Sequence, residues 1–197
     1  MLRPRTFFFA AVSLTAALTL SSCAGGSPAT ESSGSADATA ATAFNDADVS
    51  FAQMMLPHHE QAVNMSDDLL AKEDIDQGVL DLAAEIKATQ TPEIAQLRGW
   101  LTDWNAEENS MPGMGGMGDG SNGMMSNEDM MALQDASGTE ASRLFLTQMT
   151  AHHQGAVAMA QLEVDNGDNS DAQAMAANIV ETQTAEIAVM AELLATL

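Results

Sequence analysis

Apolar residues recur at helical spacing along two stretches of the first half of the chain. The first stretch carries Phe51, Met55, His58, Ala62, Met65 and Leu69, and the second carries Leu82, Ile86, Leu97, Trp100 and Leu101. Steps of three and four residues place such positions on one face of an α-helix. The pattern therefore predicts two amphipathic helices. Alternating runs are short and β-branched residues are sparse, so strands are not expected.

The second half of the chain repeats this pair of helices. Residues 54–65 read MMLPHHEQAVNM, and residues 148–159, 94 positions later, read QMTAHHQGAVAM. On the following helix Gln90 and Glu93 match Gln183 and Glu186, and the offset changes by one within the polar connectors 72–78 and 165–171. Two helical hairpins of similar length pack most simply as an antiparallel four-helix bundle. We therefore predict an all-α fold built from two repeated hairpins.

The N-terminal region has the features of an exported lipoprotein. Two arginines precede an apolar run, residues 7–20, that is too short to span a bilayer comfortably. The small residues after it lead to Cys23, as in a bacterial lipobox. We expect a signal peptide at 1–22, lipid attachment at Cys23, a flexible tether over 23–43 and a folded domain over 44–197. An ordinary secretory signal with an incidental cysteine is the alternative.

A methionine- and glycine-rich segment separates the two halves. Residues 111–131 hold seven methionines and six glycines. This glycine density disfavours regular helix, so we expect a crossover loop at 106–126 and a short helix beginning near Asn127. Thioethers among glycines pack against nothing and are soft metal ligands. Met111, Met114 and Met117 therefore predict Cu(I) or Ag(I) capture, with a partner-contact surface or chance composition as alternatives.

The charge and composition exclude several classes of protein. The formal net charge of −22 repels nucleic acid and anionic lipid headgroups and concentrates cations near the surface, although acidity also fits simple solubility. A single cysteine excludes an intramolecular disulfide and a thiolate-rich metal site. No arrangement typical of nucleophilic catalysis or phosphate binding is present. We expect a binding protein rather than an enzyme.

All four histidines lie in the two His-His pairs, with methionines around them. Adjacent helical residues point about 100° apart, so His58 and His152 are expected to face the core and His59 and His153 to lie at its edge. The flanking thioethers are Met55, Met65, Met149 and Met159. Imidazole with thioether favours copper, Cu(I) especially, and zinc through the histidines is the alternative. Binding through histidine is expected to fail as the pH drops through about 6.

Each second helix also places a Gln-x-x-Glu motif on the core face. A buried carboxylate is costly unless it is paired or binds a metal. The motif predicts a layer of His58, Glu93, His152 and Glu186, supported by Gln90 and Gln183. Three interpretations compete: a hydrogen-bond network that fixes the register of the bundle, a metal site with the glutamates as ligands or as partners of the imidazoles, and a two-metal oxidase centre. The last lacks the Glu-x-x-His of ferritin-type sites.

These motifs resemble those of the domain-of-unknown-function family 305, a family of exported bacterial proteins. The resemblance rests on Phe51, Met55, His58-His59 and Ala62 to Met65, on their counterparts at 145–159, and on both Gln-x-x-Glu-Ile segments. It implies a ferritin-like four-helix bundle, and some relatives are associated with copper binding and copper tolerance.

We therefore expect a lipid-anchored, extracytoplasmic copper buffer or chaperone that meets the membrane only through its anchor. A metal-transfer protein and a second copy of the chain are candidate partners. The alternative is a structural or protein-interaction bundle with a buried His–Glu network.

Overall fold

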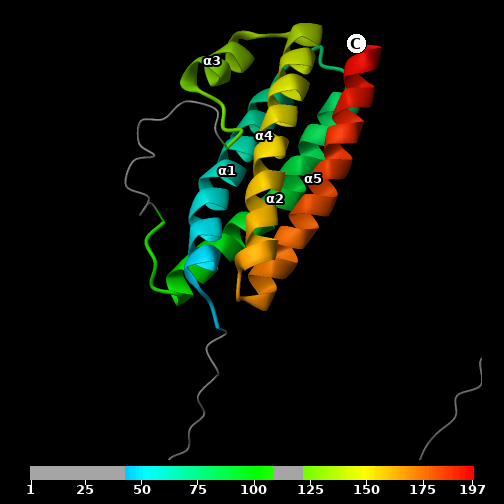
Figure 1. Ribbon diagram of the computed structural model, residues 1–197. Helices are drawn as coiled ribbons and strands as arrows, with labels where there is room; N and C mark the ends of the chain where they lie inside the picture. Colours follow the sequence, from blue (N-terminus) through cyan, green and yellow to red (C-terminus); the bar gives the residue numbers. More distant parts are fainter. Residues whose placement is uncertain (1–42, 109–121) are drawn as a thin grey trace, which may run out of the picture. The chain divides into compact units, whose positions relative to one another are not determined.

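The computed structural model describes residues 43–108 and 122–197, and all of its regular structure there is helical (Figure 1). The helices are α1 (Asp46–Leu70), α2 (Gln77–Asp103), α3 (Asn127–Asp135), α4 (Gly138–Asn166) and α5 (Ser170–Thr196). The prediction of an all-α fold is confirmed for these residues, and the short helix expected near Asn127 is α3. The predicted signal peptide, Cys23, the tether, and Met111, Met114 and Met117 lie outside the described residues.

Side-chain caps define where three of the long helices begin. The Asn45 side chain accepts hydrogen bonds from the backbone N–H groups of Ala47 and Asp48 at 2.7 and 3.2 Å. Asp76 and Asn169 cap α2 and α5 in the same way. Such caps satisfy N–H groups that have no partner within the helix. The connectors inside the two hairpins are short, and α1 lies beside α2 and α4 beside α5.

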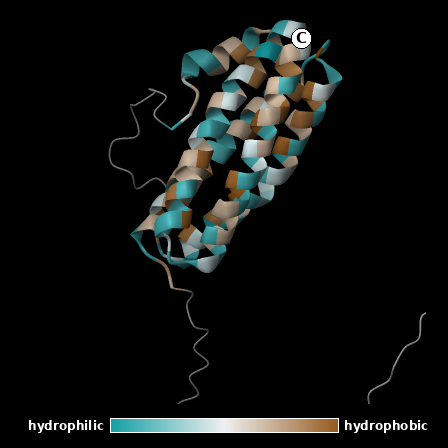
Figure 2. Ribbon diagram, turned by 45° about the vertical axis from the view of Figure 1, so that its right-hand side comes forward, coloured by the Kyte–Doolittle hydropathy of each residue, from teal (hydrophilic) through white to brown (hydrophobic). Residues whose placement is uncertain are grey.

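The four long helices pack lengthwise. α1 packs along α2, α4 along α5, and α1 on α4, while α3 lies against α1 and α4. The Asn45 side chain donates to the carbonyl of Asn166 at 2.9 Å, so the start of α1 meets the end of α4 and these two helices run in opposite directions. Figure 2 shows apolar positions gathered where the long helices face one another.

The predicted core positions are buried, and they form two clusters. All eleven positions of the two stripes are at most 7% exposed. One cluster lies toward the start of α1 and includes Phe51, Met55, Trp100, Met159 and Ile179. The other lies toward the end of α1 and includes Met65, Leu69, Ile86, Phe145 and Met149. The histidines of α1 and α4 belong to neither apolar cluster.

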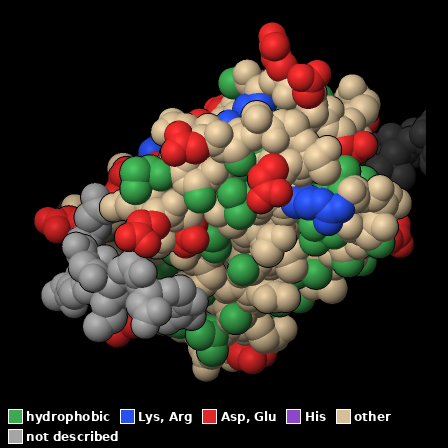
Figure 3. Space-filling view, turned by 90° about the horizontal axis from the view of Figure 1, so that it is seen from above, with side chains coloured by type: hydrophobic (Ala, Val, Ile, Leu, Met, Phe, Trp, Pro, Cys, Tyr) green, Lys and Arg blue, Asp and Glu red, His purple; other side chains and the backbone are tan. Residues whose placement is uncertain are grey.

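The surface carries the acidity of the sequence. Viewed from above, acidic side chains are spread over the visible face, with fewer Lys and Arg side chains between them (Figure 3). None of the described helices is both long enough and apolar enough to span a bilayer.

Candidate metal centre

The centre is built on the contact between His58 of α1 and His152 of α4. Their ring centroids lie 3.6 Å apart with an interplanar angle of 35°, and each residue is only 1% exposed. The repeat brings these two positions together because α1 and α4 run in opposite directions past each other. The prediction that both face the core is confirmed.

The second histidine of each pair is also buried, which corrects the expectation that it lies at the edge of the core. His59 and His153 are both 0% exposed. A helix inside this fold packs on two neighbours, so two faces separated by about 100° are both covered. His58 faces α4, whereas His59 faces α2, the hairpin partner of α1.

The glutamates pair with these second histidines, which corrects the predicted layer. His59 Nε2 lies 2.8 Å from Glu93 Oε2, and His153 Nε2 lies 2.6 Å from Glu186 Oε2. The predicted layer placed Glu93 and Glu186 with His58 and His152 instead. Each glutamate lies on the second helix of a hairpin. It therefore contacts the histidine of the first helix that points toward that second helix. The two contacts are the same in both halves.

Several buried polar atoms around the rings have no hydrogen-bond partner among the described residues. They are Nδ1 of all four histidines, Nε2 of His152, and Oε1 of Gln90 and of Gln183. Buried polar atoms are normally satisfied, and unpaired ones call for an explanation. Nitrogen lone pairs left in this way are the atoms with which imidazole binds metals. The donor set therefore fits a metal ion, although no three His, Cys, Asp or Glu side chains of the described residues already converge as ligands.

Burial keeps the central rings uncharged. It lowers the pKa of His58 to about 3, with a further lowering by the neighbouring His59, and it lowers the pKa of His152 well below its ordinary value. A neutral imidazole needs no deprotonation before it binds a metal. Proton competition at these two rings therefore falls well below the pH of about 6 that the sequence suggested.

The four predicted thioethers lie in two pairs on opposite sides of the imidazoles. Met55 and Met159 belong to the core cluster toward the start of α1, and Met65 and Met149 belong to the other cluster. All four are at most 6% exposed. Gln90 and Gln183, predicted as supporting residues, are buried at 2% and 3% exposure. The structure thus buries the predicted histidines, methionines and glutamines, and it divides the four thioethers between two separate core clusters.

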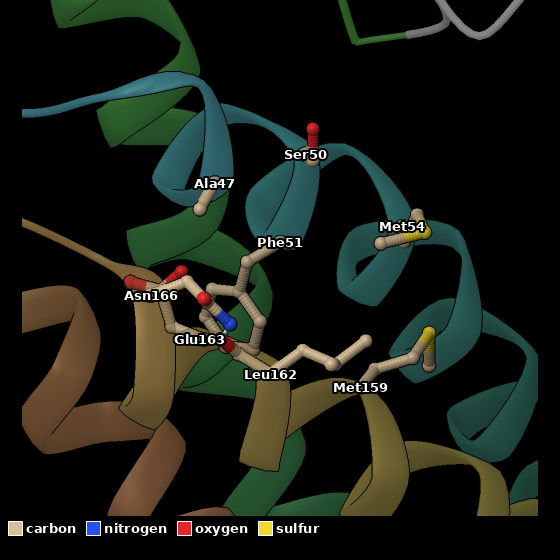
Figure 4. Close-up of a pocket in the computed structure, with 8 residues that line it drawn as sticks. All are labelled: Ala47, Ser50, Phe51, Met54, Met159, Leu162, Glu163 and Asn166. Carbon is tan, nitrogen blue, oxygen red and sulfur yellow. Dashed lines mark hydrogen bonds between the residues drawn. The ribbon is translucent and has the colours of Figure 1, made fainter.

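A cavity of about 240 Å³ opens beside one of these thioethers (Figure 4). It is lined by the start of α1 and the end of α4, including Phe51, Met54, Met159 and Glu163. The repeat-related groove, at the other end of α1 and α4, is covered by α3. There Leu133 packs into the core, and the side-chain N–H of Gln148, the counterpart of Met54, donates to the carbonyl of Asp129 at 2.9 Å. The cavity is thus the uncovered copy of a groove that α3 fills elsewhere.

The sequence analysis missed a carboxyl pair, Asp48 and Glu163, of which Glu163 lines this cavity. Asp48 and Glu163 are at most 1% exposed. Burial, together with the hydrogen bond and the charge of Asp48, raises the pKa of Glu163 to about 8. Burial alone would raise the pKa of Asp48, but hydrogen bonds from Glu163 and from three backbone N–H groups outweigh it and lower that pKa. Neither carboxylic acid has an acidic counterpart at the equivalent position in the other half of the chain, so a search for matching residues between the halves could not find them.

Comparison with known proteins adds an independent line of evidence. The sequence model described as "Domain of unknown function (DUF305)" matches residues 48–194. A DUF305 protein structure from Streptomyces coelicolor is 37% identical, with a TM-score of 0.70, over 76% of this chain and 91% of that one. A DUF305 fragment from Deinococcus radiodurans is 31% identical, with a TM-score of 0.68, over 78% and 98%.

Structures of a third protein, CopM, hold metal. CopM in the Cu(I)-bound form is 29% identical to this chain, with a TM-score of 0.61, over 74% of this chain and 94% of CopM. CopM has also been solved in Cu(II)-bound and Ag-bound forms. No curated protein matches the chain by sequence.

Proposed function

The chain belongs to the DUF305 family, and on that basis we propose that it is an extracytoplasmic copper-binding protein that buffers or passes on Cu(I). The metal is bound at the His58–His152 contact, with thioether ligands from the methionines on either side. The role is one of binding rather than catalysis.

The observation that carries this proposal is the closely spaced, tilted pair of neutral imidazoles, whose lone pairs have no hydrogen-bond partner among the described residues. A purely structural histidine pair would be expected to bury satisfied nitrogens, because an unpaired buried polar atom costs about 1–3 kcal/mol. Among residues 43–108 and 122–197, His152 has no side-chain hydrogen bond at either ring nitrogen, and His58 has none at Nδ1. A bound metal ion would satisfy these atoms, which accounts for their arrangement.

The choice of copper follows from the thioethers. Imidazole alone suits zinc, copper, iron and nickel, whereas thioether sulfur is a ligand for Cu(I) in particular. Met55 and Met159 supply buried sulfur from the core cluster toward the start of α1, and Met65 and Met149 from the cluster toward its end. CopM, which shares the fold, is known in Cu(I)-, Cu(II)- and Ag-bound forms. Zinc bound through the histidines alone remains the competing assignment.

The remaining parts of the chain fit the same role. We propose that the four long helices form an antiparallel, ferritin-like four-helix bundle, tethered by residues 23–43 to a lipid on Cys23. The cavity beside Met159 is the route by which an ion reaches the buried sulfur. Met111, Met114 and Met117 serve as a softer loading arm for Cu(I). A metal-transfer protein is the proposed partner, and a second copy of the chain is the other candidate.

One observation favours a second function, that of a structural or protein-interaction bundle. The His59–Glu93 and His153–Glu186 contacts are already satisfied at Nε2 and Oε2 without a metal. Such pairs fix the register of helices in some proteins. Under this alternative the same residues would contribute to stability and not to metal affinity.

Titration of the protein without its signal peptide separates the two functions. Cu(I) is added under a competing chelator, with Cu(II) and Zn(II) in parallel, and His58→Ala and His152→Ala are the matched variants. Stoichiometric Cu(I) binding that both variants weaken supports the copper site. Failure of all three ions to compete, with both variants only less stable, would establish the structural alternative.

A further inference from the structure

Residues 122–125 cross the face of α1 and α4 directly over the imidazole pair, and we call this segment the strap. The backbone carbonyl of Asn122 lies 3.0 Å from His58 Nε2. A carbonyl oxygen only accepts hydrogen bonds, so Nε2 of His58 must carry the proton. The neutral ring then has its lone pair on Nδ1, which is buried and has no hydrogen-bond partner in the described part of the chain.

Two repeat-related positions hold the strap in place. Gln61 of α1 binds both backbone groups of Met125: its Nε2 donates to the carbonyl at 2.9 Å, and its Oε1 accepts from the N–H at 2.7 Å. Gly155 of α4, 94 positions later, has no side chain to stand in the way. A Cβ at Gly155 would lie 1.9 Å from the carbonyl oxygen of Asn122.

The strap itself also requires a glycine. Gly123 has a φ of 77°, in the left-handed region, and a Cβ there would lie 2.5 Å from the carbonyl oxygen of Ala151. A side chain is thus excluded at both surfaces of the crossing. In the first half of the chain the Gln61 side chain hydrogen-bonds the strap. In the second half the equivalent residue, Gly155, has no side chain, so the strap can pack directly on its backbone.

We propose that the strap, positioned by Gln61, Gly123 and Gly155, fixes the tautomer of His58 and thereby makes Nδ1 the atom with which His58 binds a soft d¹⁰ cation. The ring of His152 has no such hydrogen bond to the strap. The assignment of metal rests on the proposed function, whereas the assignment of the tautomer does not. Gln61, Gly123 and Gly155 are positioning residues that act through the carbonyl of Asn122.

Hydrogen bonding to one ring nitrogen commonly orients a metal-binding histidine and raises the basicity of the other nitrogen. Nε2 is also the contacted ring atom in His59 and His153, where the partners are the carboxylates of Glu93 and Glu186. Three of the four imidazoles are therefore hydrogen-bonded at Nε2, and their Nδ1 atoms have no partner within 43–108 and 122–197. The strap gives His58 the partner that a carboxylate gives to His59 and His153.

The test is nuclear magnetic resonance of the histidine ring nitrogens in the metal-free protein at neutral pH, followed by Cu(I) titration. The wild-type protein is expected to show His58 protonated at Nε2 alone. Gly155→Ala is expected to give a mixture of tautomers at His58 and to leave His153 unchanged. Its Cu(I) affinity should fall about 10-fold or more, the range found when orienting partners are lost. Gly99→Ala is the matched control, because a Cβ on that helical glycine meets nothing within 4 Å.

A second variant keeps the test decisive if Gly155→Ala does not fold. Gln61→Ala removes both hydrogen bonds to Met125 and leaves α4 intact, so the same mixture of tautomers is expected. A His58 ring protonated at Nδ1 in the wild-type protein would overturn the proposal, as would a tautomer that neither variant changes. A fixed tautomer in a protein that binds no copper would leave the strap assignment standing and refute the metal site.

Discussion

The two helical hairpins agree at the centre of the molecule and differ around it. In both halves one histidine faces its repeat counterpart, the next contacts a glutamate through Nε2, and a glutamine oxygen is left unpaired. Away from the centre the halves diverge. The strap accepts a hydrogen bond from the ring of His58, whereas at His152 it approaches the backbone carbonyl. The acid pair Asp48–Glu163 has Ser142 and Leu69 in the corresponding positions.

This difference indicates which contacts the centre itself requires. Buried histidine–glutamate pairs and unpaired amides are costly, yet they occur twice with the same atoms. The acid pair, the cavity and the cover provided by α3 occur once each. Under the proposed copper-binding function, the repeated contacts would serve metal binding, and the single ones access, positioning and pH response.

The largest expected effect comes from breaking the central pair. His58→Ala and His152→Ala each remove a proposed metal ligand, so each should lower Cu(I) affinity by more than the roughly 10–100-fold that losing an orienting partner costs. Chelator competition measures the affinity. Equal losses in the two variants would show that both halves contribute one ligand, whereas a loss in one variant alone would mean that only one half binds the metal.

Next in size is the effect of the paired glutamates. Glu93→Gln and Glu186→Gln each weaken the charge-assisted contact to an imidazole, and we expect each to lower Cu(I) affinity about 10-fold. The contacts are alike in distance and burial, so the two losses should be similar. The same competition assay applies, with a thermal melt to confirm folding. Changed melting temperatures with unchanged affinities would assign the glutamates to stability alone.

Acid should destabilise the metal-free protein through both halves at once. The folded-state pKa of His58 is about 3, below its ordinary value of 6.5, so between these values the unfolded chain binds a proton that the folded chain does not. Stability is then fully present above about pH 6.5 and falls as the pH drops, by about 1.4 kcal/mol per pH unit for each such histidine. Urea unfolding at a series of pH values measures the slope. A flat profile over this range would contradict the assignment of neutral, buried rings.

The smallest effect comes from making the second half more like the first. The folded-state pKa of Glu163 is raised from 4.5 to about 8, so its contribution to stability is present below about pH 4.5 and is lost as the pH rises toward 8. Glu163→Leu, which installs the residue found at position 69, should remove this dependence and stabilise the fold at pH 8 by about 1–3 kcal/mol. Glu163→Gln is the isosteric control, and unfolding at pH 5 and pH 8 provides the comparison. A variant less stable at pH 8 would show that the carboxylate is needed there.

Most of the fold could be predicted from the sequence because periodicity and the repeat are local signals. The buried stripe from Phe51 to Leu69 and the start of α3 were both predictable. The pairing of the glutamates was not, because it depends on which neighbour each face of α1 meets. A helical-wheel angle places His58 inward but does not say that His59, about 100° away, is covered by α2.

The strap and the acid pair escaped prediction for a different reason. Asn122 acts through its backbone carbonyl, which no sequence pattern reports. From the sequence alone, Gly155 is a residue that weakens a helix. Its role depends on the close contact with the backbone of Asn122, which only the structure shows. Glu163 falls where the repeat has leucine, so a mismatch between the halves was the one available signal.

X-ray absorption spectroscopy of the protein loaded with one equivalent of Cu(I) tests the central claim most directly. The account predicts a mixed coordination sphere with two imidazole nitrogens and at least one thioether sulfur. His152→Ala should lose one nitrogen and keep the sulfur. A sphere of sulfur alone would place the copper away from the His58–His152 contact, and the proposed centre would then be wrong.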